Sequence, residues 1–185
     1  MACSPEELIA TIAQRTSGQR FGERAPSDQE LQALVPLLCQ VANHMNLDCW
    51  RMHTVRGDAR VDLGHAFNEA DGVVSDQPSE KPLRAPLLIA IVFSPVPHDR
   101  VPRWEQMATA TGAAHFLNLG LWATGWGSVW RTGPWISTEP VRTFHRLEPH
   151  EELLGWLYVG NLDQAPRERS GLPQPATALI SPLSE

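Results

Sequence analysis

Lysine is almost absent from this chain: Lys81 is the only one among 185 residues, and 15 Lys and Arg residues face 21 Asp and Glu residues. The net charge of −6 and the lack of any basic run argue against a nucleic-acid-binding surface. No stretch approaches the ~20 apolar residues that a membrane-spanning helix needs. Residues 1–7 carry acidic side chains and no basic segment, which argues against a signal peptide. We therefore expect a protein that binds neither nucleic acid nor membrane.

Cysteine is scarce as well, with only Cys3, Cys39 and Cys49 in the chain. An odd number without metal-ligand spacing predicts reduced thiols in a cytoplasmic protein, and no metal site. Cys39 falls in an apolar helical stretch, so we expect it to pack in the core.

The common catalytic motifs are missing. The chain contains no Gly-x-Ser-x-Gly elbow, no phosphate-binding P-loop and no dinucleotide fingerprint after a strand. His44 lies near Asn43, Asn46 and Asp48, but no second histidine stands at metal-binding spacing, so a structural hydrogen-bonding role is the alternative to a catalytic one. Without an obvious nucleophile, the sequence favours chemistry whose reactive atom belongs to a cofactor.

What the chain does contain is the composition of an ordinary globular protein, with 42% hydrophobic and 19% charged residues. We expect residues 1–185 to form a single domain with an irregular, proline-rich tail at 161–185. No internal repeat is present.

Hydrophobic periodicity predicts the elements of an α+β protein. Ser4 and Ser27 each precede an apolar helical pattern, and Glu7 and Glu30 follow three residues later, as in a capping box. The expected helices are 4–14, 27–41, 60–70, 104–125 and 138–144, and the expected strands are 50–55, 85–94, 128–131 and 153–160. Residues 71–84, rich in Gly, Ser, Pro and charge, predict a mobile loop.

Helix 104–125 is the longest pattern and is apolar or small almost all round. Such a helix is buried in a core or at a subunit interface. If the interface alternative holds, a bulky residue at Gly112 should loosen a dimer.

Two groups of residues carry possible binding chemistry. Arg15, Thr16 and Ser17 follow the first helix, and guanidinium and hydroxyl groups together bind phosphate; the alternative is a solvated basic turn. Tryptophans alternate with glycines near Arg131 and Thr132, which suits a flat ligand, and the alternative is a Trp-rich core with tight turns. These tryptophans are Trp122, Trp126, Trp130 and Trp135.

The ordered set of motifs resembles the nitroreductase family, and within it the short bacterial YdjA-like branch. The resemblance spans residues 8–173, which is almost the whole chain. It rests on RTSGQRF at 15–21, VPRWEQ at 101–106, GWGSVWRTG at 125–133 and LGWLYVG at 154–160.

This resemblance implies a three-layer α/β/α sandwich with a mostly antiparallel central sheet, and a homodimer with a long central interface helix. It also implies two FMN sites at that interface. Within one subunit the FMN would be held by Arg15, Thr16, Ser17, Trp130, Arg131 and Thr132, and Gln40 and His44 would reach it from the partner. The nicotinamide segment would be Gly120, Leu121, Trp122, Ala123, Thr124 and Gly125.

The chain departs from the family pattern at three positions. Thr16 stands where a second arginine is usual, and Gln40 replaces a partner-subunit arginine, so two positive charges are missing. Asp48 stands where the family places an amide, and a carboxylate facing the flavin would disfavour its anionic reduced form.

The function that the resemblance implies is an FMN-dependent oxidoreductase. It would take hydride from NADH or NADPH and reduce a small-molecule acceptor, such as a nitroaromatic or quinone, by a ping-pong mechanism. The alternatives are a flavin-binding or interaction protein with weak or lost turnover, and a flavin-consuming or dehalogenating member of the same superfamily.

Overall fold

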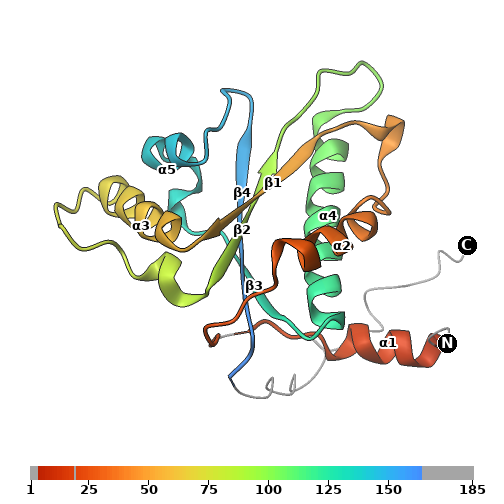
Figure 1. Cartoon of the computed structure of the whole chain (residues 1–185). Coiled ribbons are helices and arrows are strands. Elements are labelled where there is room, and N and C mark those ends of the chain that lie inside the picture. The colour runs from red at the N-terminus through yellow and green to blue at the C-terminus, as the bar shows by residue number, and fades with distance from the viewer. Residues whose placement is uncertain (1–3, 19, 164–185) are drawn as a thin grey trace, which may run out of the picture.

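The computed structural model describes residues 4–18 and 20–163, which form three layers (Figure 1). In the described part of the chain, the middle layer is a four-stranded sheet with the order β1-β2-β4-β3, and each neighbouring pair is antiparallel. The strands are β1 (Trp50–Arg56), β2 (Leu87–Phe93), β3 (Gly127–Arg131) and β4 (Glu152–Gly160). The helices are α1 (Pro5–Gln14), α2 (Asp28–Leu38), α3 (Asp58–Ala70), α4 (Arg103–Ala123) and α5 (Glu139–Phe144).

Helices cover both faces of this sheet because its central strands are apolar on both sides. Every residue of β2 is buried, as a nearly continuous apolar run predicts. On one face Phe67 of α3 meets Trp156 of β4, with ring centroids 5.3 Å apart. On the other face Leu117 of α4 packs with Ile89 of β2. The expected α/β/α sandwich with an antiparallel sheet is confirmed.

α1 and α2 each begin at a serine that caps the helix. The Ser4 and Ser27 hydroxyls accept from the backbone N–H of Glu7 and Glu30, and the two glutamate carboxylates accept from the backbone N–H of Ser4 and Ser27. Both capping boxes predicted from the sequence are therefore formed. α2 ends at Leu38, earlier than expected, two residues after the proline inside it.

The early end of α2 changes the surroundings of Cys39. This residue is the C-cap of α2 and is exposed, so its predicted place in the core is wrong. Cys49, just before β1, is the buried thiol, with its Sγ 3.6 Å from the Gln106 carbonyl oxygen. Burial raises the pKa of the Cys49 thiol, which keeps it protonated.

A β-bulge shapes the sheet next to β3. The register between β2 and β4 shifts between Ile91 and Val92, opposite Leu154. The freed Leu154 carbonyl accepts a hydrogen bond from Trp130 Nε1 at 3.0 Å. The next residue, Gly155, has φ +114°, and a Cβ there would lie 2.4 Å from the Arg131 carbonyl oxygen. The bulge and this glycine together let the end of β3 lie close against β4.

α4 buries one side and leaves the other open. On the buried side, a Cβ added at Gly112 would lie 2.4 Å from Val41 of the same chain. Val41 of the same chain therefore lies beside Gly112, and contact of Gly112 with a second subunit stays a prediction. The open side carries exposed and half-buried residues at spacings of three and four, namely Trp104, Ala108, Thr111, His115, Leu119, Trp122 and Ala123.

α1 is amphipathic, yet none of its residues is buried. Its apolar side chains Leu8, Ile9 and Ile12 are between 48% and 66% exposed. In Figure 1 the helix lies beside the C-terminal end of α4 and extends away from the sheet. Among the described residues, no helix combines the length and apolar character needed to cross a membrane.

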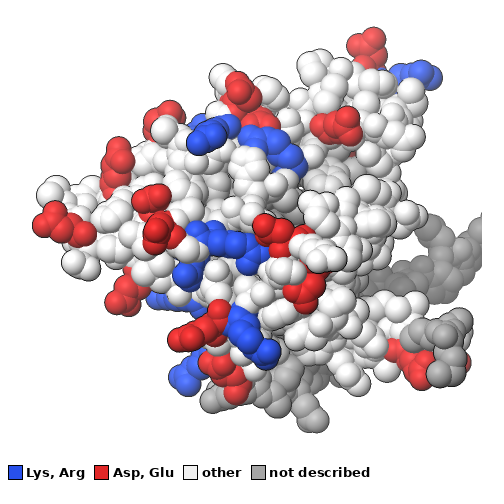
Figure 2. All heavy atoms as spheres, in the orientation of Figure 1, with Lys and Arg blue, Asp and Glu red and all other residues white. Residues whose placement is uncertain are grey.

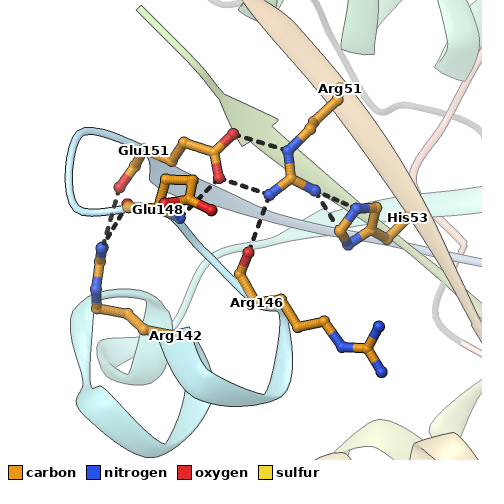
Figure 3. Close-up of polar contacts among 6 residues, drawn as sticks. All are labelled: Arg51, His53, Arg142, Arg146, Glu148 and Glu151. Carbon is orange, nitrogen blue, oxygen red and sulfur yellow. Dashed lines mark hydrogen bonds and ion pairs between the residues drawn. The ribbon is translucent and has the colours of Figure 1, made fainter.

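A buried polar network ties β1 to the turn before β4 (Figure 3). Glu151 is 3% exposed and accepts from Arg51 through both carboxylate oxygens, at 2.7 and 2.5 Å. It also accepts from the Glu148 backbone N–H at 2.9 Å. These charged hydrogen bonds lower the pKa of Glu151 to about 2. Arg51 further contacts His53. This network fixes the sheet edge and lies apart from the residues predicted for the site.

Candidate functional site

A pocket of about 220 Å³ opens between the end of β3 and a short 3-10 helix, η2 (Lys81–Arg84). We call it the cationic pocket. Its lining residues come from α3, η2, β3, β4 and the turn after β3, and they are Phe67, Lys81, Arg84, Arg131, Thr132, Gly133, Trp135, Trp156 and Tyr158. Two residues predicted to bind a cofactor, Arg131 and Thr132, therefore lie together in a cavity.

Three cations border this pocket. The Arg131 guanidinium carbon lies 5.6 Å from the Tyr158 ring centroid, and Lys81 Nζ lies 3.8 Å from the Trp135 ring centroid. The exposed Arg84 guanidinium has no hydrogen-bond or ion-pair partner within residues 4–18 and 20–163. The local charge is positive although the chain is acidic, and Figure 2 shows the basic side chains of one face interspersed with acidic ones.

The aromatic wall of the pocket is held by several contacts. Trp135 stacks on Phe67 with a centroid separation of 4.7 Å and an interplanar angle of 14°. Its indole Nε1 donates to Asp71 Oδ1 at 2.7 Å, and Asp71 lies 3.7 Å from Lys81. The tryptophan is thereby fixed beneath the lysine. Phe67 and Lys81 therefore occupy the two faces of the Trp135 ring.

Tyr158 is a weak acid in this pocket. Burial raises its pKa to about 12, although Arg131 and Arg84 act in the opposite direction. The phenol stays protonated across the physiological range, so Tyr158 adds a neutral ring to the wall.

The second predicted cofactor segment splits between the two faces of the sheet. Trp130 points toward α4, where its ring centroid lies 5.3 Å from that of His115. Arg131 points to the opposite face, over Tyr158. Because successive strand residues alternate in direction, Trp130 and Arg131 lie on opposite faces. Arg131 lines the cationic pocket together with Thr132, which follows the end of β3.

Arg15, Thr16 and Ser17 lie next to β3. Arg15 and Thr16 are half-buried and Ser17 is exposed. The Gly18 N–H then donates to the Ser128 carbonyl at 2.9 Å, which fixes this segment beside the start of β3. Ser128 is three residues from Arg131, or ~10 Å along a strand. The two predicted cofactor segments are therefore neighbours in the fold.

Gln40 and His44 lie elsewhere in the same chain. Both are exposed, and Nδ1 of His44 lies 2.9 Å from Glu105 Oε1 in the first turn of α4. Trp130 meets α4 ten residues further on, at His115, which is ~15 Å along the helix axis. One chain does not bring these two residues to the cationic pocket. Asp48 is exposed at the end of the same loop.

The predicted nicotinamide segment covers the last turns of α4. Gly120 and Leu121 are buried against α2 and the sheet, and Trp122 is half-buried. The exposed part of the segment consists of Ala123, Thr124 and Gly125.

Sequence reasoning missed two pocket cations. Lys81 and Arg84 lie in what was predicted to be a mobile loop, but they form η2 immediately before β2. The sequence did contain a pattern that could have indicated them: two cations three residues apart, next to a proline and directly before a buried strand. Residues 4–18 and 20–163 contain no group of three His, Cys, Asp or Glu side chains that could hold a metal ion.

The chain matches a known protein family over most of its length. Residues 12–161 match the family model described as "Nitroreductase family". The protein named "Putative NAD(P)H nitroreductase YdjA" of Escherichia coli (strain K12) is 25% identical over 175 residues, which cover 91% of this chain and 96% of that protein.

Solved structures agree in fold. The nitroreductase-like family protein from Bacillus cereus superposes with a TM-score of 0.81 at 19% identity and covers 100% of both chains. A point mutant of NfnB from Sphigopyxis sp. strain HMH, described as an FMN and NADPH-dependent nitroreductase, gives a TM-score of 0.73 at 16% identity. That match covers 96% of this chain and 99% of the NfnB chain.

Proposed function

Because the chain belongs to the nitroreductase family, we propose that it is an FMN-dependent oxidoreductase that takes electrons from NAD(P)H. The acceptor would be a small organic molecule such as a nitroaromatic or a quinone. The observation that carries this proposal is the cationic pocket, where Arg131 and Thr132 meet Lys81 and Arg84 beside an aromatic wall. Its cytoplasmic location stays a prediction from the cysteine content.

The residues of this pocket fit a phosphorylated aromatic cofactor. A phosphate, or the anionic edge of a reduced flavin, requires cations, and Lys81, Arg84 and Arg131 supply them. These cations compensate for the positive charges that Thr16 and Gln40 remove from the family pattern. Trp135, Trp156 and Tyr158 add aromatic surface to the lining. The fit is therefore chiefly one of charge.

When bound, FMN supplies the redox chemistry by accepting a hydride and passing electrons on, so no protein nucleophile is required. The protein's own residues would bind and orient the cofactor. Arg15, Thr16 and Ser17 would contact its phosphate and ribityl chain, since guanidinium and hydroxyl groups are suited to both. The exposed end of the predicted nicotinamide segment, 123–125, would meet the electron donor.

The proposed site is incomplete in one chain. At about 220 Å³ the cationic pocket is smaller than the ~300–1,000 Å³ of pockets that bury a drug-sized ligand. His44 lies in the α4 layer, whereas the pocket lies on the opposite face. We propose that a two-fold dimer brings the partner's His44 and the partner's Gln40 to the edge of β3, beside Trp130 on the α4 side of the sheet.

Two exposed surfaces support this dimer. The open side of α4 presents half-buried Leu119 and Trp122 with exposed Ala108, and α1 presents Leu8, Ile9 and Ile12. Apolar helical faces of this kind normally pack against a partner. A two-fold axis crossing α4 would place each helix against its own copy.

The experiment that tests this function begins with the visible spectrum of the purified protein, with and without added FMN. Protein-bound flavin with bands near ~370 and ~450 nm, bleached by anaerobic NADH or NADPH, would support the proposal. Bound flavin that neither nucleotide bleaches would favour a flavin-binding protein without turnover. Failure to take up FMN would refute the proposal.

A further inference from the structure

The loop that carries His44 has an unusual backbone. Met45 and Asn46 both have positive φ, at 65° and 51°, although neither is glycine. Such conformations cost free energy and persist where the surroundings hold them. The Asn43 side chain supplies two of the restraints: its Nδ2 donates to the Leu47 carbonyl at 3.0 Å, and its Oδ1 accepts from the Leu47 N–H at 3.1 Å.

α4 supplies further restraints on this loop. Thr109 Oγ1 donates to the Ala42 carbonyl at 2.9 Å, just before the loop. Glu105, one turn earlier in α4, lies 2.9 Å from His44 Nδ1. A carboxylate only accepts hydrogen bonds, so Nδ1 carries the hydrogen and donates it. Nε2 is then the ring nitrogen left for other partners.

The His44 side chain is held but accessible. It is 48% exposed, and neighbouring Trp104 and Met45 are 71% and 48% exposed. The arrangement is preorganised. Asn43 closes the strained loop, Glu105 fixes the imidazole ring, and the surface around Nε2 is open. Nε2 is therefore accessible to a molecule or subunit that packs against this surface.

Among the described residues, the lining of the cationic pocket includes no histidine and no carboxyl group. Burial raises the pKa of Tyr158 to about 12, so its phenol is a poor proton donor. Reduction of a quinone or nitro group places negative charge on oxygen, which must be protonated. An imidazole exchanges protons near neutral pH. A donor from the partner subunit would meet this need.

We propose that His44 donates a proton from Nε2 to the acceptor oxygen in the partner subunit's site, and that Glu105 is its positioning residue. The donating ring is the imidazolium, with hydrogen on both nitrogens. The Nε2–H bond breaks and an O–H bond forms on the acceptor, which takes its hydride from the reduced flavin. His44 is left as the neutral ring with its hydrogen on Nδ1 toward Glu105, and solvent returns the Nε2 proton. This inference rests on the proposed FMN-dependent function.

The test compares the wild-type protein with Glu105→Ala, Glu105→Gln and His44→Gln variants. Glu152→Gln is the matched control, because Glu152 also pairs with a side chain at the start of α4, Arg103. In the FMN-free protein, long-range proton–nitrogen NMR reports which ring nitrogen of His44 carries hydrogen. We expect Nδ1–H in the wild type and in Glu105→Gln, whose amide oxygen also accepts, but not in Glu105→Ala.

The second measurement is the rate at which a quinone reoxidises dithionite-reduced flavin, at saturating FMN. His44→Gln should slow reoxidation on the order of 10²-fold. Glu105→Ala should slow it about tenfold, with partial recovery in Glu105→Gln. The Glu152→Gln control should reoxidise at the wild-type rate.

The possible outcomes distinguish the proton-donor inference for His44 from the proposed FMN-dependent function. Unchanged reoxidation in flavin-loaded His44→Gln and Glu105→Ala would overturn the inference alone, as would a neutral His44 ring that lacks hydrogen on Nδ1 although Glu105 is present. Failure to take up FMN would overturn the proposed function and this inference together.

Discussion

Trp156 donates a hydrogen bond from its indole Nε1 to Nε2 of His145 at 2.9 Å, and both side chains are buried in the same core. Because Nε2 accepts, the hydrogen of the neutral ring is on Nδ1. Burial, followed by the nearby charges of His53 and Arg51, lowers the pKa of His145 to about 3. The native state therefore holds this histidine neutral.

The pH dependence of stability follows from that lowered pKa. The unfolded chain takes up a proton at His145 near pH 6.5, whereas the folded chain does so only near pH 3. Stability is therefore full above pH 6.5 and falls as the pH drops toward 3, by about 2 kcal/mol at pH 5. His145→Gln keeps an acceptor for Trp156 but cannot titrate. Thermal unfolding between pH 8 and pH 5 should show a shallower slope for this variant, and an equal slope would contradict the assignment.

A second acid transition is expected from Glu151. Its folded pKa of about 2 lies below the ordinary 4.5, so its stabilisation is present above pH 4.5 and is lost as the pH falls toward 2. At neutral pH, Glu151→Gln should lower the free energy of unfolding on the order of 2 kcal/mol, because buried Arg51 hydrogen bonds lose their charged acceptor. The adjacent Glu152→Gln breaks only an exposed pair and should cost about 0–1 kcal/mol. Urea denaturation measures both, and equal costs would show that burial of the pair is irrelevant.

The bulge in β4 gives a prediction about cofactor retention. Gly155→Ala places a Cβ 2.4 Å from the Arg131 carbonyl and should push the end of β3 away from β4. We expect weaker FMN binding and lower stability. Gly72→Ala is the control, since Gly72 also has positive φ, at +68°, but an added Cβ meets nothing within 4 Å. It should cost only ~1 kcal/mol of backbone strain and leave FMN bound. Flavin absorbance after gel filtration distinguishes the two variants.

The pocket cations give a prediction about affinity. Arg84→Ala removes a guanidinium that has no partner among the described residues, so the fold should be unaffected. FMN affinity should fall by about 10–100-fold, which corresponds to the ~1.5–3 kcal/mol of a charged hydrogen bond. Arg100→Ala, an exposed arginine before α4, is the control. Equal FMN titrations for both variants would remove Arg84 from the site.

The proposed interface can be tested on the open side of α4. Leu119→Glu introduces a charge on a half-buried position outside the buried core clusters, so a monomer should still fold. Light scattering coupled to gel filtration should show loss of the dimer, accompanied by loss of FMN. A Leu119→Glu protein that remains dimeric would move the interface away from this side of α4.

Much of the fold could be predicted because its signals are local. The capping boxes at Ser4 and Ser27 and the apolar run that forms β2 depend on neighbouring residues in sequence. Periodicity also predicted α4 within two residues at its C-terminal end. These features follow from short-range geometry, which a sequence displays directly.

The features that were not predicted depend on contacts between distant residues. Cys39 is exposed because α2 ends before it, and Gly112 contacts Val41, 71 positions earlier in the chain. Lys81 and Arg84 reach the pocket only once β3 and β4 have paired beside them. The pairing of Arg51 with Glu151 joins residues 100 positions apart. Patterns within a window of residues contain no information on such contacts.

The separation of His44 from the cationic pocket has a genetic consequence. If each subunit contributes one half to each of two sites, two impaired variants with defects in different halves should complement one another. A hybrid of an Arg84→Ala subunit with a His44→Gln subunit would gather both defects in one site and leave the other site whole. Activity above that of either variant alone, measured at limiting FMN after the two proteins are mixed, would then report directly that the catalytic unit is the pair of chains.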